Sequence, residues 1–307
     1  MERWEIVRAF ITGPLVEVAL PKPGNVNRFR DFRDLSVYNF LVAYPALVGI
    51  YHETVRRGEL IRSGVLSPAE AGLGELIRRS AEATRRVQSG NPDFGVLVLS
   101  IPLIAGLALT KKLSEGGEKA RLLLEESSVR DTMELYRAIR ILEPKGIPRG
   151  VKYDVYSEDA FEELFRDRVN LMRLAELSCP RETIFCEWLN SYGITYGAFS
   201  RILRLAKEMP LEDASVRLFL ELLAERGDTL IRRKAGEAEE LLVRKRAREV
   251  IEGKLSIEEF DAFLREEGDL RNPGSTADIV AVALSLVFLS GVGVEMKNGR
   301  AWLTARP

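Results

Sequence analysis

The sequence predicts an all-α protein, because its apolar residues follow helical rather than strand spacing. Apolar residues recur at helical spacing along most of the chain, as they do across residues 37–51. Alternation with a period of two, which marks a half-buried strand, is scarce. Residues 96–109 and 279–294 form long apolar stretches that fall short of the roughly 20 residues of a membrane span. We therefore expect two buried core helices and no membrane segment.

Local signals support several of the expected helix starts. Asn91 at a cap position, Pro92 at the first helical position and Asp93 in the first turn form a coherent start. Ser275 and Asp278 have the spacing of a capping box. The expected helices span residues 3–19, 36–58, 67–89, 92–111, 116–125, 130–141, 157–177, 181–207, 211–226, 228–252, 256–266 and 275–290.

The C-terminus carries a hairpin signal, since Asn298-Gly299 is the pair favoured in two-residue type I′ turns. It separates expected strands at residues 294–297 and 300–303. No repeat and no low-complexity linker divides the chain, which predicts a single helical domain over residues 1–307. Residues 142–156, rich in proline and glycine, are the hinge candidate.

Composition excludes several classes of protein. The 45 basic and 46 acidic residues give a net charge of −1, which argues against a nucleic-acid binder. His52 is the one histidine, so a site that needs two histidines is excluded, and we expect this ring to be structural. Cys179 and Cys186 cannot build a disulfide framework or a zinc cluster, and we expect small buried apolar side chains.

The start of the chain indicates a cytoplasmic protein, because charged residues interrupt the apolar ones where a signal peptide would need a continuous run. Arginine greatly outnumbers lysine and glutamine is almost absent, a bias that leans towards a thermophile.

The first motif that could carry chemistry is the loop at residues 20–34, LPKPGNVNRFRDFRD. Its two prolines stiffen the loop, and Gly24 allows backbone conformations closed to other residues. An ordinary connection between helices is the alternative explanation. The side chains that it could present to an anionic ligand are those of Lys22, Asn25, Asn27 and Arg28.

Two further motifs stand at the starts of the two apolar helices. SGNPDFG and NPGSTAD both place free N–H groups at a helix end, where a phosphate can dock. If both helices begin on the same side of the core, their ends would converge on one pocket. Capping and catalysis are equally good explanations of Asp278. The other candidate ligand contacts in these motifs are Asn91, Gly95, Asn272, Gly274 and Ser275.

The fourth motif, GDTLIRRKAG, places Asp228 beside the basic residues Arg233 and Lys234. A surface ion pair between Asp228 and Arg232 is its structural explanation. Carboxylate oxygens are suitable ligands for Mg²⁺, and the chain has neither a Walker A motif nor a G-x-G-x-x-G motif. The candidate metal ligands are Asp34, Asp228 and Asp278, and the candidate catalytic residues are Glu17, Asp228 and Asp278.

Taken in order, these motifs resemble those of the triphosphoribosyl-dephospho-CoA synthase family, from EVALPKPGNVNR to NPGSTAD. The resemblance implies an all-helical enzyme that joins ATP to 3′-dephospho-CoA. In that reaction the 2′-hydroxyl of dephospho-CoA displaces adenine from the anomeric carbon of ATP. The resemblance places Lys22, Arg28, Arg233 and Lys234 at the phosphates.

The chain departs from the bacterial pattern of this family and looks more like its archaeal branch. Bacterial members read N-T-H-K-G where this chain has NPDFG, and Asn27 stands where an aspartate is usual. A related nucleotide transferase or hydrolase with another acceptor is thus the first alternative, and a non-enzymatic helical interaction protein is the second. Expected partners are nucleotides and CoA-type molecules rather than nucleic acid or membrane. The oligomeric state, a homo-oligomer included, is left open.

Overall fold

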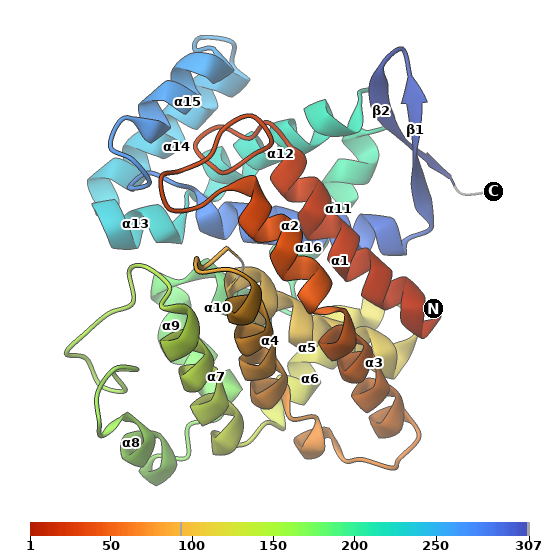
Figure 1. The fold of residues 1–307 in the computed structure, drawn as a ribbon, viewed down its shortest axis with the longest axis vertical. Helices are drawn as coiled ribbons and strands as arrows, with labels where there is room; N and C mark the ends of the chain where they lie inside the picture. The colour runs from red at the N-terminus through yellow and green to blue at the C-terminus, as the bar shows by residue number, and fades with distance from the viewer. Residues whose placement is uncertain (93, 306–307) are drawn as a thin grey trace. The chain divides into compact units, whose positions relative to one another are not determined.

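The structure, a computed structural model, describes residues 1–92 and 94–305, and helices dominate them (Figure 1). These described residues form sixteen α-helices, three 3-10 helices and one two-stranded antiparallel hairpin. The predicted all-α class with a C-terminal hairpin is confirmed. Within the described part of the chain, every helix is too short or too polar to cross a bilayer.

The chain divides into two compact units that interleave in sequence. Unit 1 comprises Met1–Ile11 and Leu41–Gly193, and unit 2 comprises Thr12–Phe40 and Ile194–Pro307. Helices α1 (Arg3–Ala19) and α2 (Val37–Ala46) contribute residues to both units. The hinge candidate at residues 142–156 lies inside unit 1, and the single domain expected over residues 1–307 stays a prediction.

Unit 1 is built around α5 (Phe94–Thr110), which is buried along residues 96–108 because almost all of its side chains are apolar. Its remaining α-helices are α3 (Val48–Arg62), α4 (Leu73–Val87), α6 (Gly116–Glu125), α7 (Val129–Leu142), α8 (Ala160–Arg166), α9 (Leu171–Ser178) and α10 (Thr183–Leu189). Its 3-10 helices are Pro68–Glu70, Leu113–Glu115 and Cys179–Arg181.

A proline inside α5 is compensated by side chains from the neighbouring segment. Pro102 has no N–H, so the carbonyl oxygen of Val98 loses its intrahelical donor. Trp188 donates its indole Nε1–H to this oxygen at 3.2 Å, and the Tyr192 hydroxyl donates to Leu99 O at 2.9 Å. The buried backbone of α5 is therefore satisfied from residues 188–192, which explains why both aromatic side chains are fully buried.

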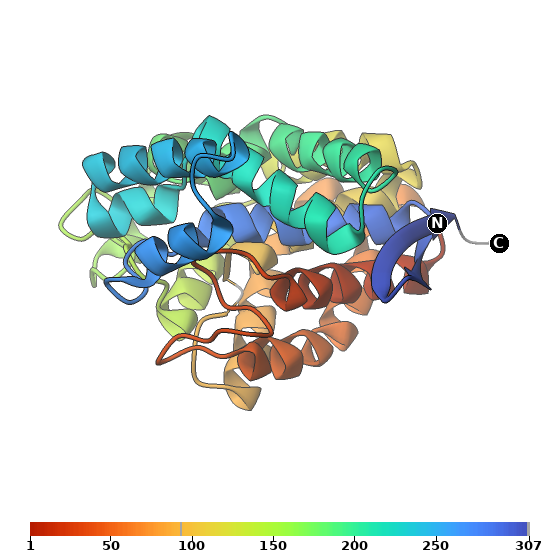
Figure 2. The ribbon, with the colours of Figure 1, turned by 90° about the horizontal axis from the view of Figure 1, so that it is seen from above.

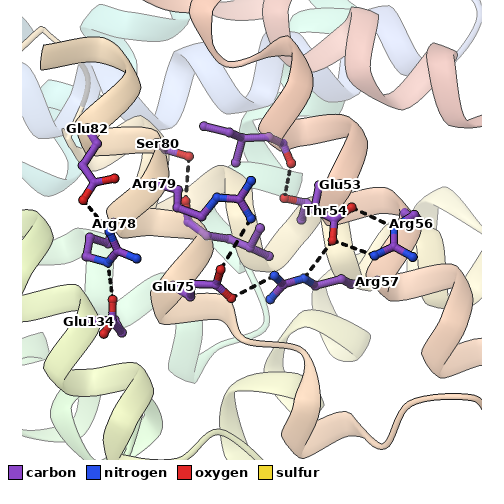
Figure 3. Close-up of polar contacts among 12 residues, drawn as sticks. Glu53, Thr54, Arg56, Arg57, Glu75, Arg78, Arg79, Ser80, Glu82 and Glu134 are labelled. Carbon is purple, nitrogen blue, oxygen red and sulfur yellow. Dashed lines mark hydrogen bonds and ion pairs between the residues drawn. The ribbon is translucent and has the colours of Figure 1, made fainter. Parts of the chain in front are cut away.

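Glycines and arginines set the helix contacts of unit 1. A Cβ at Gly106 of α5 would lie 2.4 Å from Gly116 O of α6, so only glycine allows this approach. On the outer side, Arg57 of α3 donates to Glu75 of α4 at 2.8 Å (Figure 3). Arg78 of α4 likewise donates to Glu134 of α7. Close backbone packing thus joins α5 to α6, and the arginine bridges join α4 to α3 and to α7.

Unit 2 is built around α16 (Gly274–Leu289), the second apolar helix, which is buried along nearly its whole length. Gly13 of α1 lies against α16, where an added Cβ would be 2.4 Å from Ser285 N. The remaining helices of unit 2 are α11 (Gly193–Leu205), α12 (Leu211–Arg226), α13 (Thr229–Ala235), α14 (Glu237–Ile251) and α15 (Ile257–Arg265). Both apolar stretches are thus core helices, as predicted.

The hairpin follows directly after α16 (Figure 2). Strands β1 (Val292–Lys297) and β2 (Arg300–Ala305) pair in antiparallel register around Asn298-Gly299. Both turn residues have positive φ, as a type I′ turn requires. The predicted turn is confirmed, and each strand extends two residues further from it than expected.

Several expected helices are broken, and those predictions of continuous helices were wrong. Residues 36–58 divide into α2 and α3 around Leu47, and residues 67–89 into a 3-10 helix and α4. Residues 157–177 divide into α8 and α9, where Arg168 has φ +50°. Residues 181–207 divide at Ser191 and Tyr192, and residues 228–252 divide at Gly236. All three have positive φ, which residues other than glycine rarely adopt.

The two cysteines also differ from the prediction. Cys179 and Cys186 form a disulfide bond that closes the turn between α9 and α10. The expectation of two separate apolar side chains was therefore wrong, because the 3-10 helix at Cys179–Arg181 folds the chain back on itself.

Candidate functional site

The loop between α1 and α2 is anchored by one buried lysine. The Lys22 side chain is fully buried, and its Nζ lies 2.7 Å from Glu17 Oε1. The same Nζ donates to Glu17 O at 2.7 Å and to Val26 O at 3.4 Å. Lys22 thus ties the end of α1 to the middle of the loop.

Burial dominates the electrostatics of this ion pair. Burial raises the pKa of Glu17 above the ordinary value for a glutamate, while the charge of Lys22 acts in the opposite direction. It lowers the pKa of Lys22, against the opposing effects of Glu17 and then Asp278. Each partner therefore depends on the other to remain charged in the interior.

Asn27 shapes the rest of this loop. Its side-chain amide donates to the carbonyl oxygens of Lys22 and Asn25, at 3.1 and 3.3 Å. Its Oδ1 accepts from the backbone N–H groups of Phe29 and Arg30, at 2.9 and 3.1 Å. Both the NH₂ group and the oxygen of the Asn27 amide make hydrogen bonds to the backbone, so Asn27 stabilises a turn in the loop.

Asp228 joins two helix starts in unit 2. Its Oδ1 accepts from the N–H groups of Leu230 and Ile231, which caps α13. Its Oδ2 accepts from the N–H and the hydroxyl of Thr276, in the first turn of α16. Burial raises the pKa of this carboxyl, and the hydrogen bonds from Thr276 oppose that shift. One buried side chain therefore stabilises both helix starts.

Asp278 lies one turn into α16 and is partly exposed. Its charge acts on the pKa of Lys22 from the loop and on that of Arg233 from α13. Burial lowers the pKa of Arg233 to about 10, and Asp278 partly offsets this shift. The first, third and fourth motifs thus bring Lys22 and Arg233 within electrostatic reach of Asp278. We call these three residues and Glu17 the charge cluster.

The residues around the start of α16 have packing roles. Lys234 pairs with Asp269 Oδ2 at 3.1 Å, which ties α13 to the segment before α16. Gly274 faces Leu230, and the Thr229 hydroxyl donates to Ser275 Oγ at 3.2 Å. The predicted capping box at Ser275 was wrong, because α16 begins at Gly274 and its N-cap position is occupied by Pro273.

Other predicted residues lie outside the charge cluster. Arg28 pairs with Glu212 of α12 at 2.6 Å, and Asp34 is exposed. Asn91 Oδ1 accepts from Phe94 N at 3.2 Å, but α5 begins at Phe94, so the predicted helix start at Asn91 and Pro92 lies too early. Asn91 and Gly95 belong to unit 1, so the convergence expected of the two apolar helix starts stays a prediction. Asp93 lies outside the described residues.

A surface hollow of about 560 Å³ lies in unit 1, between the start of α7 and the segment joining α8 to α9. None of the candidate site residues lines it. The lining residues are Ser127, Val129, Phe165, Arg166, Arg168 and Asn170.

Comparison with known proteins decides the class of enzyme. A family model described as ATP:dephospho-CoA triphosphoribosyl transferase matches residues 3–296. The chain belongs to that family. It is a transferase that moves the triphosphoribosyl group of ATP to dephospho-CoA. The resemblance drawn from the four motifs is confirmed, and the non-enzymatic alternative is wrong.

The fold is shared with a solved structure from Archaeoglobus fulgidus described as a triphosphoribosyl-dephospho-CoA synthase. The TM-score is 0.64 at 20% sequence identity, over 83% of this chain and 98% of that one. No curated protein sequence matches the chain. The structural likeness therefore supports the fold, and the family assignment rests on the family model.

Sequence reasoning about this transferase missed two charged residues that contact the loop. Asp261 and Arg265 of α15 bond to the backbone of residues 24 and 25. Their four-residue spacing is visible in the sequence, but it is equally typical of a surface pair on any helix. No local signal links α15 to a loop more than 230 residues away in the chain.

Proposed function

We propose that the charge cluster of unit 2 is the centre of triphosphoribosyl transfer. The observation that carries this proposal is the electrostatic coupling of Asp278 to Lys22 and Arg233, which come from three separate motifs. Perturbed titratable groups that gather from distant segments are a common feature of active sites.

The reaction needs a base and a way for adenine to leave. A bond forms between the 2′-oxygen of dephospho-CoA and the anomeric carbon of the ATP ribose. The bond from that carbon to adenine breaks, and adenine leaves with its electron pair and takes up a proton. The proton of the attacking hydroxyl passes to a carboxylate, which is general-base catalysis.

We assign the base role to Asp278 among the three candidate carboxylates. Glu17 is buried against Lys22, and both oxygens of Asp228 already accept two hydrogen bonds. Asp278 is partly exposed, and its charge acts on both Lys22 and Arg233. Glu17 and Asp228 are then positioning residues that hold the loop and the two helix starts.

Arg233 is our candidate for binding the triphosphate. Guanidinium groups suit phosphate geometry, and the charge of Asp278 acts on the pKa of this one. Lys22 is fully buried and bonded to the loop, so we propose that it acts by positioning rather than by direct contact with phosphate.

The described residues do not fit a magnesium site built by the protein alone. No group of three or more acidic, histidine or cysteine side chains among them could share a metal ion. Mg²⁺ commonly binds through one or two carboxylates together with substrate phosphates. We propose that the ion arrives with the triphosphate, and no catalytic step above depends on it.

Replacement of Asp278 by asparagine tests the base assignment. Asp278→Asn keeps the side-chain volume and removes the proton acceptor, so adenine release should fall by a factor of about 10²–10⁴. Glu258→Gln, on an exposed residue of α15, is the matched control and should retain wild-type turnover. An Asp278→Asn variant with unchanged turnover would remove Asp278 from the mechanism.

A further inference from the structure

Helix α15 presents one face to the loop between α1 and α2, beside which it runs (Figure 1). The residues on that face, Asp261, Leu264 and Arg265, are spaced by three and four positions, so they lie on the same side of the helix. All of their contacts described below lie within unit 2.

Asp261 is the centre of this contact. Its Oδ1 accepts from Gly24 N at 2.7 Å and from Arg265 Nε at 2.8 Å. Its Oδ2 accepts from Arg30 Nη1 at 2.8 Å. The carboxylate thus receives donors from the loop backbone, from a loop side chain and from its own helix. Its side chain is only 12% exposed, so the bonds from Gly24 and Arg265 are largely shielded from water, whereas Arg30 is 59% exposed.

Leu264 and Arg265 make further contacts between α15 and the loop. Gly24 has φ +70°, and a Cβ there would lie 2.5 Å from Leu264 Cδ1. Arg265 donates to Asn25 O, and its guanidinium lies 5.0 Å from the centre of the Phe32 ring. The loop is therefore held at two places, by Lys22 near the end of α1 and by α15 at residues 24–30.

We propose that Asp261 is a positioning residue of the transferase, which holds residues 22–30 in the conformation that borders the binding site of the ATP triphosphate. This inference rests on the proposed function, because it assumes that the loop borders the nucleotide site. The loop carries several arginines, and Asp261 offsets the repulsion between Arg30 and Arg265 when the loop lies against α15. Without Asp261, the loop loses its only described carboxylate contact to α15.

The test compares Asp261→Ala and Asp261→Asn with Glu258→Ala, an exposed residue on the same helix. The alanine variant removes every acceptor. The asparagine variant keeps one oxygen for Gly24 N–H but loses the charge that attracts Arg30. The first readout is the adenine-release assay, which gives the KM for ATP and the turnover rate. The second readout is the rate at which trypsin cleaves after the loop arginines in the absence of ligand, with the cleavage sites located by mass spectrometry.

We expect Asp261→Ala to raise the KM for ATP about tenfold while turnover changes less than about threefold. Loop cleavage by trypsin should be several-fold faster, and Asp261→Asn should lie between alanine and wild type in both readouts. A purely structural role would instead change the KM for ATP and the turnover rate by similar factors. That result, or loop cleavage equal to that of Glu258→Ala, overturns the proposal.

The trypsin readout needs no activity, so it tests the loop anchor even if the wild-type protein releases no adenine. In that case the proposed function fails while the structural part of this inference is still decided. If Asp261→Ala does not fold, Asp261→Asn alone decides the proposal: faster loop cleavage with a raised KM supports it, and wild-type values in both contradict it.

Discussion

Thr276 donates both its backbone N–H and its hydroxyl to Oδ2 of Asp228, at 2.7 and 2.8 Å. Because Oδ1 of the same carboxylate caps α13, the starts of α13 and α16 share one buried acceptor. Arg233 lies on one of these helices and Asp278 on the other, so Asp228 fixes the elements that carry both.

Loss of Asp228 should destabilise the protein strongly. Asp228→Ala leaves two helix starts without their cap, and the free energy of unfolding should fall by about 2–4 kcal/mol. Thr276→Val removes only the hydroxyl donor and should cost about 1 kcal/mol. Asp159→Ala is the control, because this exposed N-cap residue of α8 makes no capping hydrogen bond. Urea unfolding measures all three, and equal losses for Asp228 and Asp159 would refute the double-cap interpretation.

The buried pair of Glu17 and Lys22 should be more sensitive to loss of one partner than to loss of both. Lys22→Met leaves the Glu17 carboxyl buried without its cation and should lower the free energy of unfolding by about 3–5 kcal/mol. The double variant Glu17→Leu with Lys22→Met should recover much of that loss. Chemical denaturation of the single and double variants provides the comparison, and additive losses would show that the pair is not coupled.

The Lys22→Met variant should also show a defined pH dependence. Burial raises the pKa of Glu17 in the folded protein, and the cation that opposes this shift is absent in the variant. An acid whose folded pKa exceeds its unfolded value stabilises the fold at low pH and loses that contribution as pH rises through the folded pKa. The difference in the free energy of unfolding between wild type and Lys22→Met should therefore shrink as the pH falls towards about 4. A deficit that is constant across pH would contradict the cause given for the Glu17 shift.

A methyl group at Gly24 should disturb the loop more than one at a comparable glycine. Gly24 and Gly253 have φ values of +70° and +72°, so alanine is strained at both. Only at Gly24 does the added Cβ meet a neighbour within 4 Å, namely Leu264. Gly24→Ala should cost about 1–3 kcal/mol more than Gly253→Ala and should reduce adenine release as well. Thermal melts and turnover assays check this, and equal effects of the two variants would argue against close packing of the loop on α15.

Glu53 in unit 1 should contribute stability that acid removes. Hydrogen bonds from Arg56 and then Arg57 lower its pKa from 4.5 to about 2, against the effect of burial (Figure 3). Because the folded pKa lies below the unfolded one, the contribution is present above pH 4.5 and is lost as pH falls towards 2. Glu53→Gln should cost about 0.5–1 kcal/mol near neutral pH, since the pair is partly screened by solvent. Unfolding at a series of pH values should show this difference vanish in acid, and a difference that persists there would count against the assignment.

The fold class was predictable because helical periodicity is a local property of the sequence. The break at Arg168 was not, since this residue takes positive φ without a local glycine or proline signal. At Ser191 and Tyr192 the adjacent Gly193 is the first residue of the next helix, α11, and it did not mark the positive φ of the two residues before it. The disulfide likewise depends on a fold-back of the chain that spacing alone does not show.

Prediction of the site was limited in the same way. The sequence placed Asp228 and Ser275 close to the starts of α13 and α16, because loop breaks are visible in the sequence. The surface ion pair offered as the structural explanation of Asp228 was wrong, since this residue is buried and caps α13. The partners of those residues were not visible. Lys234 was expected at a phosphate and pairs with Asp269, and Asp261 had no signal because its contact to Gly24 spans 237 residues. Such pairings depend on the packing of distant segments.

The most direct test of the central claim is to incubate the wild-type protein with ATP and dephospho-CoA and to measure free adenine together with the coupled product by chromatography and mass spectrometry. Reactions with ATP alone and with CoA in place of dephospho-CoA are the controls. We predict equal amounts of adenine and of a dephospho-CoA adduct that carries the complete triphosphoribosyl group, formed only when dephospho-CoA is present. Release of ADP, AMP or phosphate without adenine, or adenine release that does not depend on dephospho-CoA, would contradict the account.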